Sequence, residues 1–462
     1  MQQNRDAVKI PLPQQFVERL HQEIEGADEL CQVLDGQSPT SVRFNPYKIT
    51  SPPRGLEIVG WSRYGFYLPQ RPSFTLDSAF HAGTYYVQEA SSQFVGHILS
   101  QRNIEGAKVI DMCAAPGGKS TLYSTLVGLD GLVVANEINR QRAAILADNS
   151  RKWGLGNIVV SNNDTSHLAQ FEAWADVVAV DAPCSGEGMF RKMEDARTEW
   201  SEANVKMCAE RQKEILRNAW KALRPGGILI YSTCTFNTIE NEEVVQDFVE
   251  YAQDEIAPYE SVECNEDWGI VKSNISEFQC FRFFPHLTKG EGFFAAVACK
   301  SYDAGGKSRL PKPRKSIFSP LDKSSLREVC RWVEQSELMH FSMVADTIYG
   351  YYATQAESVK RLAESLTVIY SGVAMGQIFK GKLKPDGALA LFHALNREAV
   401  GVATLDNDDI LSYLRKAELS AELFDEEGVN LVCSAEGHAV GWVKRVGRRV
   451  NNLYPNTLRI LK

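Results

Sequence analysis

Short apolar strands alternate with helices from about residue 86 to residue 300, and this alternation limits the folds open to the chain. The segments with strand character are residues 107–111, 132–136, 157–161, 176–181 and 226–232. Helical periodicity lies between them, from Ser120 onward and over residues 140–153 and 205–223. Strands that are apolar on both sides belong inside a parallel sheet that helices cover on both faces. We therefore expect an α/β, Rossmann-like core with a doubly wound, mostly parallel sheet.

The chain has 462 residues, which is too many for one hydrophobic core, so we expect several domains. Residues 1–85 combine a helical stretch with segments rich in aromatic and β-branched residues, which indicates a small α+β domain. The core follows as residues 86–300. Residues 301–318 are basic and rich in Gly and Pro, as in a linker. We expect residues 319–380 to be helical and residues 381–462 to be strand-rich.

The overall composition argues against several classes of protein. No apolar run approaches the roughly 20 residues of a membrane helix. The first residues, MQQNRDAVKIPLPQQF, lack the regions of a signal peptide, so we expect a cytoplasmic protein. The ten cysteines include no CxxC pair, which argues against zinc and against a disulfide framework, and we expect no metal. Nothing in the sequence requires a dimer, so we expect a monomer.

A loop of small residues links the first core strand to the next helix. It consists of Cys113, Ala114, Ala115, Pro116, Gly117, Gly118 and Lys119. Adjacent glycines let a ligand approach the backbone, and the helix N-terminus offers free N–H groups to an anion such as the carboxylate of a methionine tail. The GxxxxGK[ST] pattern of a phosphate-binding loop is absent. A Gly-Gly turn alone is at least as often only a turn.

Three acidic residues, Glu137, Asp164 and Asp181, lie at the ends of the next three strands. Glu137 is about 20 residues past the loop, where a nucleoside-binding fold holds ribose hydroxyls. The carboxyl ends of the strands form the edge at which open α/β sheets bind ligands. A single Asp there is more often a helix cap. The loop and the three acids together nevertheless predict a nucleoside cofactor at this edge.

Two cysteines also follow strands of the core, Cys184 in DAPCSG and Cys234 in YSTCT. This arrangement suits methylation of cytosine at C5. A thiolate that adds to C6 makes C5 nucleophilic, and a base must later remove the C5 proton. An acid near N3 assists the addition, and Asp181 is the candidate. Taken singly, either cysteine is more often a small buried residue, and spacing does not decide which of the two attacks.

Five segments resemble the Sun/nucleolar-protein family of RNA cytosine-C5 methyltransferases, in its bacterial RsmF-like branch. They are GTYYVQEASSQ, DMCAAPGGKS, DAPCSGEGMFRK, RPGGILIYSTCTFNTIENE and FFPHLTKGEGFF. The resemblance covers about residues 1–300 and implies a class I methyltransferase core. The C-terminal GWVKRVGRRVNNLYPNTLR resembles the PUA-like RNA-binding domain of the same branch, although this match is shorter and less specific.

The resemblance implies a role for each matching residue. Cys234 is the nucleophile, and Cys184 assists removal of the proton and release of the product. The Cys113–Lys119 loop, Glu137, Asp164 and Asp181 contact S-adenosyl-L-methionine or the methyl-transfer site. The substrate is RNA, 16S ribosomal RNA or the small ribosomal subunit. By analogy with DNA cytosine methyltransferases, the Pro183-Cys184 thiol would attack instead, so only the family resemblance selects Cys234.

Basic residues in three places are candidate RNA contacts. They are Arg43 and Asn45 near the N-terminus, Arg191 and Lys192 after the first cysteine motif, and Lys444, Arg445, Arg448 and Arg449 near the C-terminus. The formal charge of −8 gives no such indication. Solvated charges on an ordinary surface would give the same pattern.

Two other functions deserve comparison with a cytosine-C5 RNA methyltransferase. A ribose 2′-O methyltransferase can share an AAPGG loop, but it needs a base centred on lysine and no cysteines. A ribosome-assembly factor with a decayed catalytic core would be expected to have lost at least one motif, and every motif is intact.

Overall fold

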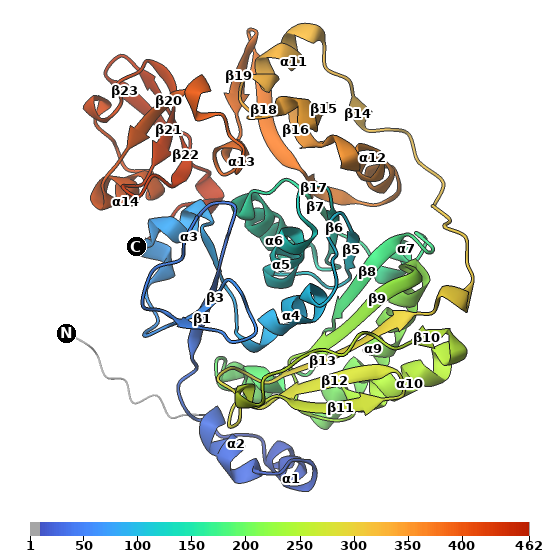
Figure 1. Ribbon diagram of the computed structural model, residues 1–462. Coiled ribbons are helices and arrows are strands. Elements are labelled where there is room, and N and C mark those ends of the chain that lie inside the picture. The colour runs from blue at the N-terminus through green and yellow to red at the C-terminus, as the bar shows by residue number, and fades with distance from the viewer. Residues whose placement is uncertain (1–9, 462) are drawn as a thin grey trace, which may run out of the picture.

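The computed structural model describes residues 10–461, and its centre is a ten-stranded mixed sheet. The prediction about a signal peptide concerns residues 1–16, and residues 1–9 of this segment lie outside the described residues. The strands of the parallel part run in the order β9-β8-β5-β6-β7. Their bounds are Lys108–Asp111 for β5, Leu132–Asn136 for β6, Ile158–Ser161 for β7, Ala175–Asp181 for β8 and Leu223–Thr233 for β9. The predicted doubly wound, mostly parallel sheet is confirmed (Figure 1).

The strand order reverses at β5, which pairs with β6 on one side and with β8 on the other. Chains that leave β5 and β8 therefore diverge and open a crevice above the carboxyl ends of the strands. Both the small-residue loop and the two cysteine motifs begin at these ends. The topology thus brings together segments that are far apart in the sequence.

Antiparallel strands extend the sheet at both edges. On one side, β13 pairs with β9, and the order continues through β12 to β11, while β10 pairs with the end of β13. On the other side, β17 pairs with β7. The bounds are Ile256–Ala257 for β10, Val271–Ile275 for β11, Phe278–Phe283 for β12, Phe293–Lys300 for β13 and Val368–Ser371 for β17.

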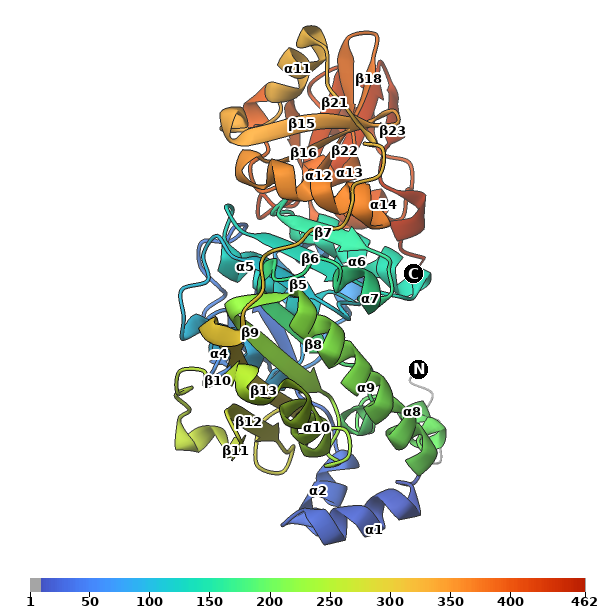
Figure 2. The same ribbon diagram turned by 90° about the vertical axis from the view of Figure 1, so that its right-hand side faces the viewer.

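Helices cover both faces of the sheet and bury two separate apolar layers. One layer includes residues of α4 (Phe94–Ser100), α5 (Gly118–Val127) and α6 (Arg140–Trp153). The other includes residues of α7 (Thr165–Leu168), α9 (Glu202–Ala222) and α10 (Glu242–Ala252). The sheet is apolar on both sides because both sides are covered. Figure 2 shows α9 and α10 lying along the lower strands.

The N-terminal region consists of two helices and a four-stranded antiparallel sheet in the order β2-β3-β1-β4. The helices are α1 (Gln14–Glu23) and α2 (Ala27–Leu34), and the strands are β1 (Thr40–Phe44), β2 (Glu57–Ile58), β3 (Gly65–Leu68) and β4 (Tyr85–Val87). Helix α3 (Ser78–Ala82) leads into β4. The two N-terminal helices pack against the core through Phe16, Leu20 and Leu30, which share one apolar cluster with Phe190 and Phe236. The helices therefore contact the segments that follow Cys184 and Cys234.

Arg43 and Asn45, two predicted RNA contacts, are buried in this fold, which leaves their side chains no free surface for RNA. Arg43 is 1% exposed and donates to Gln88, to Thr121 and to the Gly118 carbonyl. Its guanidinium lies 4.5 Å from the ring centroid of Trp153. Asn45 is 0% exposed and donates to the Trp153 carbonyl. Both side chains link the N-terminal sheet to the core by hydrogen bonds. In a sequence, a basic residue near aromatic residues looks the same whether it is buried or binds RNA.

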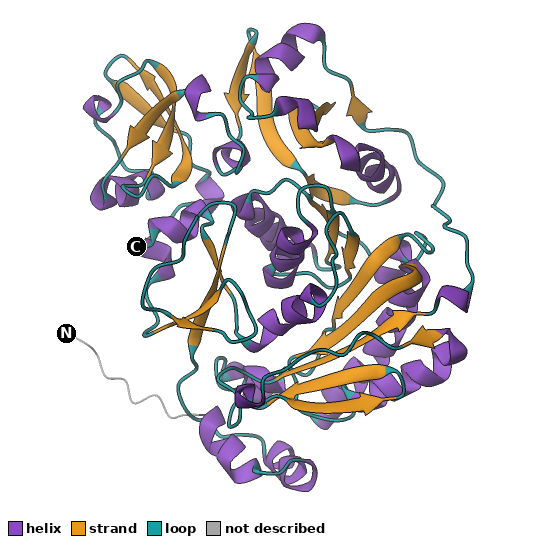
Figure 3. Ribbon diagram, in the orientation of Figure 1, coloured by secondary structure: helices purple, strands orange, loops and turns teal. Residues whose placement is uncertain are grey.

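The basic linker runs over the outside of the molecule, past the core sheet, to the C-terminal half (Figures 1 and 2). The following region was expected to be helical, and this expectation is wrong. It contains α11 (Lys323–Cys330) and α12 (Ala356–Ser365), but also β14 (Phe318–Ser319), β15 (Met339–Val344), β16 (Thr347–Tyr352) and β18 (Val373–Phe379). With β19 (Lys382–Pro385) these strands form a five-stranded sheet. Figure 3 shows the strands between the helices.

The sequence does contain a signal for two of these strands, which form a hairpin. MHFSMV and TIYGYY are rich in aromatic and β-branched residues, and Val344 faces Thr347 across a two-residue turn.

The last sheet has the order β20-β21-β22-β23, with α13 (Gly387–Ala390) and α14 (Asn407–Leu414) beside it. Its strands are Gly401–Thr404, Gly428–Cys433, Ala439–Val446 and Arg449–Asn452. Apart from the helical region, the domain bounds stay predictions. No helix within residues 10–461 is long and apolar enough to cross a membrane.

Replacing Arg43 with Lys should lower the free energy of unfolding by about 2–4 kcal/mol, because lysine cannot make the forked hydrogen bonds of a buried guanidinium. Urea denaturation measures this change. Arg63→Lys, at an exposed arginine of the same region, should change stability by less than about 0.5 kcal/mol. Equal effects of the two substitutions would contradict the structural role of Arg43.

Candidate active site

The small-residue loop after β5 is held from outside by α6. Arg142 donates to the Ala115 carbonyl at 2.8 Å, and Asn149 donates to the Pro116 carbonyl at 2.8 Å. Gly117 has φ of +115°, a conformation that favours glycine, and no side chain caps the following helix α5. The first N–H groups of α5 are therefore available to an anion. The loop has the geometry that the sequence predicts for a cofactor site.

Asp111, the last residue of β5, is a buried acid that the sequence analysis did not single out. Its Oδ2 accepts a hydrogen bond from Ser120, whereas its Oδ1 is buried without a hydrogen-bond partner among the described residues. Burial is the main cause that raises the pKa of Asp111 to about 7. Its place at the carboxyl end of a core strand was the available signal. A buried oxygen without a donor fits a site for a ligand that carries an N–H or ammonium group.

Glu137 and Asp164 lie at the same edge but differ in their surroundings. Glu137 is buried, accepts from the Asn139 N–H and lies 3.3 Å from a guanidinium nitrogen of Arg142. Asp164 is exposed and caps α7, where it accepts from the backbone and the hydroxyl of Ser166. These hydrogen bonds lower the pKa of Asp164. Asp164 therefore has the structural function of a helix cap, and its contact with a cofactor stays a prediction.

Asp181 forms an ion pair with Lys119 across the crevice. Its Oδ2 lies 2.8 Å from the ammonium nitrogen, and its Oδ1 accepts from Ser232 at 2.9 Å. Burial lowers the pKa of Lys119, but the charge and hydrogen bond of Asp181 outweigh burial and raise it. The charge of Cys234 acts in the same direction. This ion pair favours a proton on Lys119, and the role of Asp181 near N3 stays a prediction.

The two cysteines meet at the ends of β8 and β9. The Sγ atoms of Cys184 and Cys234 lie 3.3 Å apart, and each residue is partly exposed. The hydrogen bond to Cys234, together with burial, raises the pKa of the Cys184 thiol well above its ordinary value. Cys184 therefore keeps its proton more readily than a free thiol does. Either sulfur can donate the hydrogen bond between the two.

Two buried glutamates hold the cysteine loops together. Glu240 accepts from the Ser185 N–H at 2.9 Å, from the Ser185 hydroxyl, from Asn237 at 2.8 Å and from Gln212 at 2.9 Å. Glu187 accepts from the N–H groups of Phe236 and Asn237. The sequence analysis named neither glutamate as part of the site. Both lie within the two cysteine motifs of the sequence. Only their contacts in the structure distinguish these buried glutamates from acidic residues on the surface.

The remaining candidate RNA contacts lie in two places. Arg191 is partly buried and hydrogen-bonds to the Gln37 carbonyl, whereas Lys192 is exposed with its ammonium 4.0 Å from Glu291. Near the C-terminus, Lys444, Arg448 and Arg449 are exposed on the β22–β23 hairpin. Arg445 is only partly exposed and donates to the Phe424 and Asp425 carbonyls. Their contact with RNA stays a prediction.

Three family models match the chain in consecutive regions. The model described as 16S rRNA methyltransferase RsmB/F matches residues 97–298. The N-terminal domain of 16S rRNA methyltransferase RsmF matches residues 12–90, and the methyltransferase RsmF PUA domain matches residues 401–460. Residues 299–400, which include the five-stranded sheet, lie outside these three matches.

Curated relatives match over most of their length. A protein of Vibrio vulnificus named ribosomal RNA small subunit methyltransferase F is 34% identical over 73% of this chain and 78% of its own. A protein of the same name from Erwinia tasmaniensis is 29% identical over 97% of each chain. Among solved structures, a methyltransferase homolog from Pyrococcus horikoshii is 26% identical, with a TM-score of 0.50 over 63% of this chain and all of its own. A structure titled NSun6 from the same organism, with SFG, is 20% identical with a TM-score of 0.52 over 64% of this chain and all of its own, and shows a shared fold.

Replacing Glu240 with Gln should lower the free energy of unfolding by about 2–4 kcal/mol, because the amide turns an –NH₂ group toward donors that need an acceptor. Loosening of the loop should also speed alkylation of Cys184 by iodoacetamide, which peptide mass spectrometry measures. Glu243→Gln, at an exposed glutamate nearby, serves as the control. Unchanged stability and alkylation in Glu240→Gln would show that the loop does not depend on this carboxylate.

Asp111→Asn should change how stability depends on pH. In the ligand-free protein the pKa of Asp111 is about 7, against roughly 4 in the unfolded chain. The unfolded state therefore loses its proton first, and stability falls as pH rises from about 4 to about 7. Asn removes this loss, so the variant should gain on the order of 2–4 kcal/mol relative to the parent protein between pH 4.5 and 7.5 in urea titrations. A difference that does not vary with pH would show that Asp111 ionises normally.

Proposed function

The chain belongs to the 16S rRNA methyltransferase RsmB/F family, and on this premise we propose that it methylates C5 of a cytidine in 16S ribosomal RNA. It is an S-adenosylmethionine-dependent methyltransferase. In the proposed reaction, Cys234 forms a covalent bond to C6 of the cytosine. The observation that carries this proposal is the 3.3 Å contact between two thiols at the strand ends, one of which keeps its proton.

The residues at the crevice fit the cofactor. The buried Oδ1 of Asp111 lacks a donor, which an ammonium group would supply. The N–H groups that begin α5 suit a carboxylate, and Glu137 suits ribose hydroxyls. When bound, S-adenosylmethionine supplies an electrophilic methyl group. Asp111, the Cys113–Lys119 loop and Glu137 would therefore hold it at the switch point of the sheet.

Cys234 is the better nucleophile of the pair on physical grounds. Attack requires a thiolate, and the raised pKa of Cys184 keeps that sulfur neutral. Lys119 lies close enough to Cys234 for each charge to stabilise the other. This asymmetry agrees with the family resemblance and argues against attack by the Pro183-Cys184 thiol.

Lys119 and Asp181 are placed to assist the addition. When the thiolate bonds to C6, negative charge builds up on the ring at N3. The protonated Lys119 can donate to N3, while Asp181 holds the ammonium in place at 2.8 Å. The sequence predicts Asp181 as the acid near N3, whereas in this proposal Lys119 donates to N3 and Asp181 positions Lys119.

Cys184 is placed to act after the methyl group has transferred. The charge of Cys234 is one cause of the raised pKa of Cys184. Once Cys234 is bonded to C6, that charge is gone, so Cys184 can release its thiol proton to solvent and then accept the C5 proton. Removal of this proton lets the C6–S bond break and regenerates the Cys234 thiolate.

A ribose 2′-O transfer is less well supported by the same site. That reaction needs a lysine that accepts a proton, and the raised pKa of Lys119 keeps its proton in place.

We propose that the cytosine methylation takes place in the cytoplasm and that the protein acts as a monomer. The exposed Lys444, Arg448 and Arg449 would follow the RNA backbone.

Cys234→Ala should neither methylate 16S rRNA nor form an adduct, because no sulfur attacks C6. Cys184→Ala should lower turnover by roughly 10²–10⁴-fold and accumulate a covalent protein–RNA adduct, because the C5 proton is not removed. Denaturing gels with labelled cofactor measure both effects, and Cys330→Ser in α11 should resemble the parent protein. An adduct in Cys234→Ala but not in Cys184→Ala would reverse the assignment. A methyl group on a ribose oxygen would exclude cytosine-C5 chemistry.

A further inference from the structure

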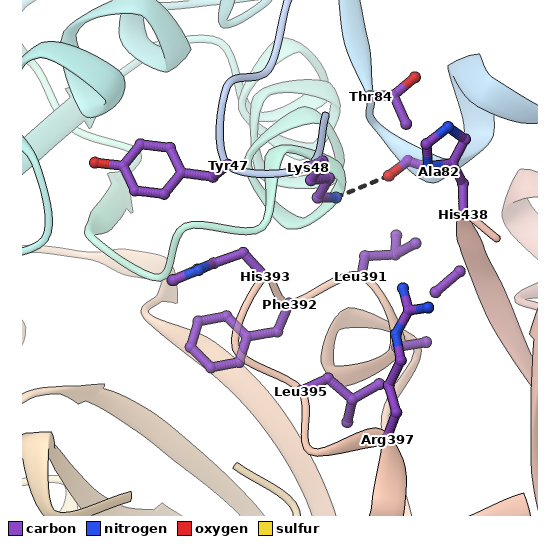
Figure 4. A pocket seen from close by; sticks show the side chains of 12 residues that line it. Tyr47, Lys48, Ala82, Thr84, Leu391, Phe392, His393, Leu395, Arg397 and His438 are labelled. Atoms are coloured by element: carbon purple, nitrogen blue, oxygen red, sulfur yellow. Dashed lines mark hydrogen bonds between the residues drawn. The ribbon is translucent and has the colours of Figure 1, made fainter. Parts of the chain in front are cut away.

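A small cavity lies where the N-terminal region meets the C-terminal half of the chain. Its volume is about 110 Å³ (Figure 4). Four segments line it: residues 47–48 after β1, residues 82–84 after α3, residues 390–397 after α13, and residues 438–439 at the start of β22. The His393 N–H donates to the Gly154 carbonyl at the end of α6, so the core supports the cavity. Neither the cofactor crevice nor the cysteine pair contributes to it.

Four of the side chains that line this cavity are cationic or able to become so. They are Lys48, Arg397, His393 and His438, and no lining residue in the described part of the chain is acidic. Figure 4 shows Lys48 and Arg397 entering from opposite sides. Lys48 donates to the carbonyls of Ala82 at 2.8 Å and Lys152 at 2.7 Å, which are neutral acceptors. Its third ammonium hydrogen is free to meet a ligand.

Three of the basic groups of the cavity have lowered pKa values, because they are buried without a carboxylate among the lining residues. Burial, together with the charge of Lys152, lowers the pKa of Lys48 to about 7. Burial and the charge of Lys48 lower the pKa of His393 to about 4, and burial lowers that of His438. A lysine in such surroundings is normally paired with a carboxylate.

The nearest carboxylates are engaged elsewhere. Asp77 caps α3 and accepts from the Tyr85 hydroxyl, and Glu436 accepts from Ser434. Both influence His438 through their charge, but neither lines the cavity. The cavity therefore joins positive groups from two distant parts of the chain without an internal anion to balance them.

We propose that this cavity binds a phosphate group, which supplies the missing negative charge. A tetrahedral group with several acceptor oxygens can accept from the Lys48 ammonium and the Arg397 guanidinium together. A volume of about 110 Å³ admits a phosphate group. Tyr47 and Phe392 form the apolar walls.

The phosphate has two sources, the backbone of the RNA substrate and free inorganic phosphate. The RNA source rests on the proposed function. A backbone phosphate held here would fix the path of the RNA between the N-terminal sheet and the PUA-like sheet, because both contribute lining residues. Free phosphate would instead act as a bridge that rigidifies this junction.

Binding of inorganic phosphate to the whole protein, without RNA or cofactor, tests the site itself. Isothermal titration at constant ionic strength, with chloride as the reference anion, should detect saturable binding to the parent protein. Arg397→Gln, which removes an exposed guanidinium, should weaken binding at least tenfold. Lys48→Met should do the same, and Lys48→Arg should restore most of it. Lys221→Met, on an exposed position of α9, is the charge-matched control.

Binding of 16S rRNA fragments over a range of salt concentrations then separates the two sources. If the phosphate belongs to RNA, Arg397→Gln should raise the KM for RNA with little change in kcat and make the salt slope shallower by about one unit. If phosphate binds but RNA affinity does not change, free phosphate is the ligand. Saturable phosphate binding that Arg397→Gln and Lys48→Met leave unchanged, or no phosphate binding at all, would overturn the proposal. Because the phosphate assay involves no methyl transfer, its result does not depend on the proposed function.

Discussion

The hydrogen bonds that converge on Glu240 determine whether this molecule has an active site. Cys184 and Cys234 follow different strands and lie 50 residues apart in the sequence, yet their sulfur atoms lie 3.3 Å apart. Parallel pairing of β8 with β9 brings the strand ends together, but it does not orient the loops beyond them. Glu240 does so by accepting from Ser185 in one loop and from Asn237 in the other. A buried carboxylate with this many donors permits little movement, because each lost partner leaves a costly unsatisfied group.

The positions of protons follow from this geometry. Bringing two thiols together makes one of them keep its proton, since two negative charges at that distance are unfavourable. Asp181, which lies 2.8 Å from the Lys119 ammonium, favours the charge on Lys119. Asp111 lies behind them with one oxygen unsatisfied. The cofactor side and the nucleophile side of the crevice are thus parts of one electrostatic system, in which the lysine of the small-residue loop is the shared member.

The C-terminal half is joined to the core by backbone pairing as well as by side chains. Strand β17 adds to the edge of the core sheet beside β7, and Gln355 donates to the carbonyls of Leu129 and Gly131. These contacts join the region that precedes the PUA-like sheet to the core. The cationic cavity is lined by residues from both halves of the chain. RNA bound across this junction would therefore meet a surface of fixed shape.

The sequence by itself determined the parts that depend on local pattern. Fully apolar strands predicted the parallel sheet, and the turn from strand to helix at Gly117 and Gly118 predicted the cofactor loop. The hairpin of β15 and β16 lies in a region predicted to be helical, because short apolar runs do not separate the two structures. Other features depend on contacts over long distances in the chain. Arg43, a predicted RNA contact, is buried and donates to Thr121 of the core. The preference for Cys234 over Cys184 as the nucleophile comes from family resemblance and stays a prediction, which the raised pKa of Cys184 supports. A pKa depends on burial and on neighbouring charges, and only the tertiary structure decides which groups those are.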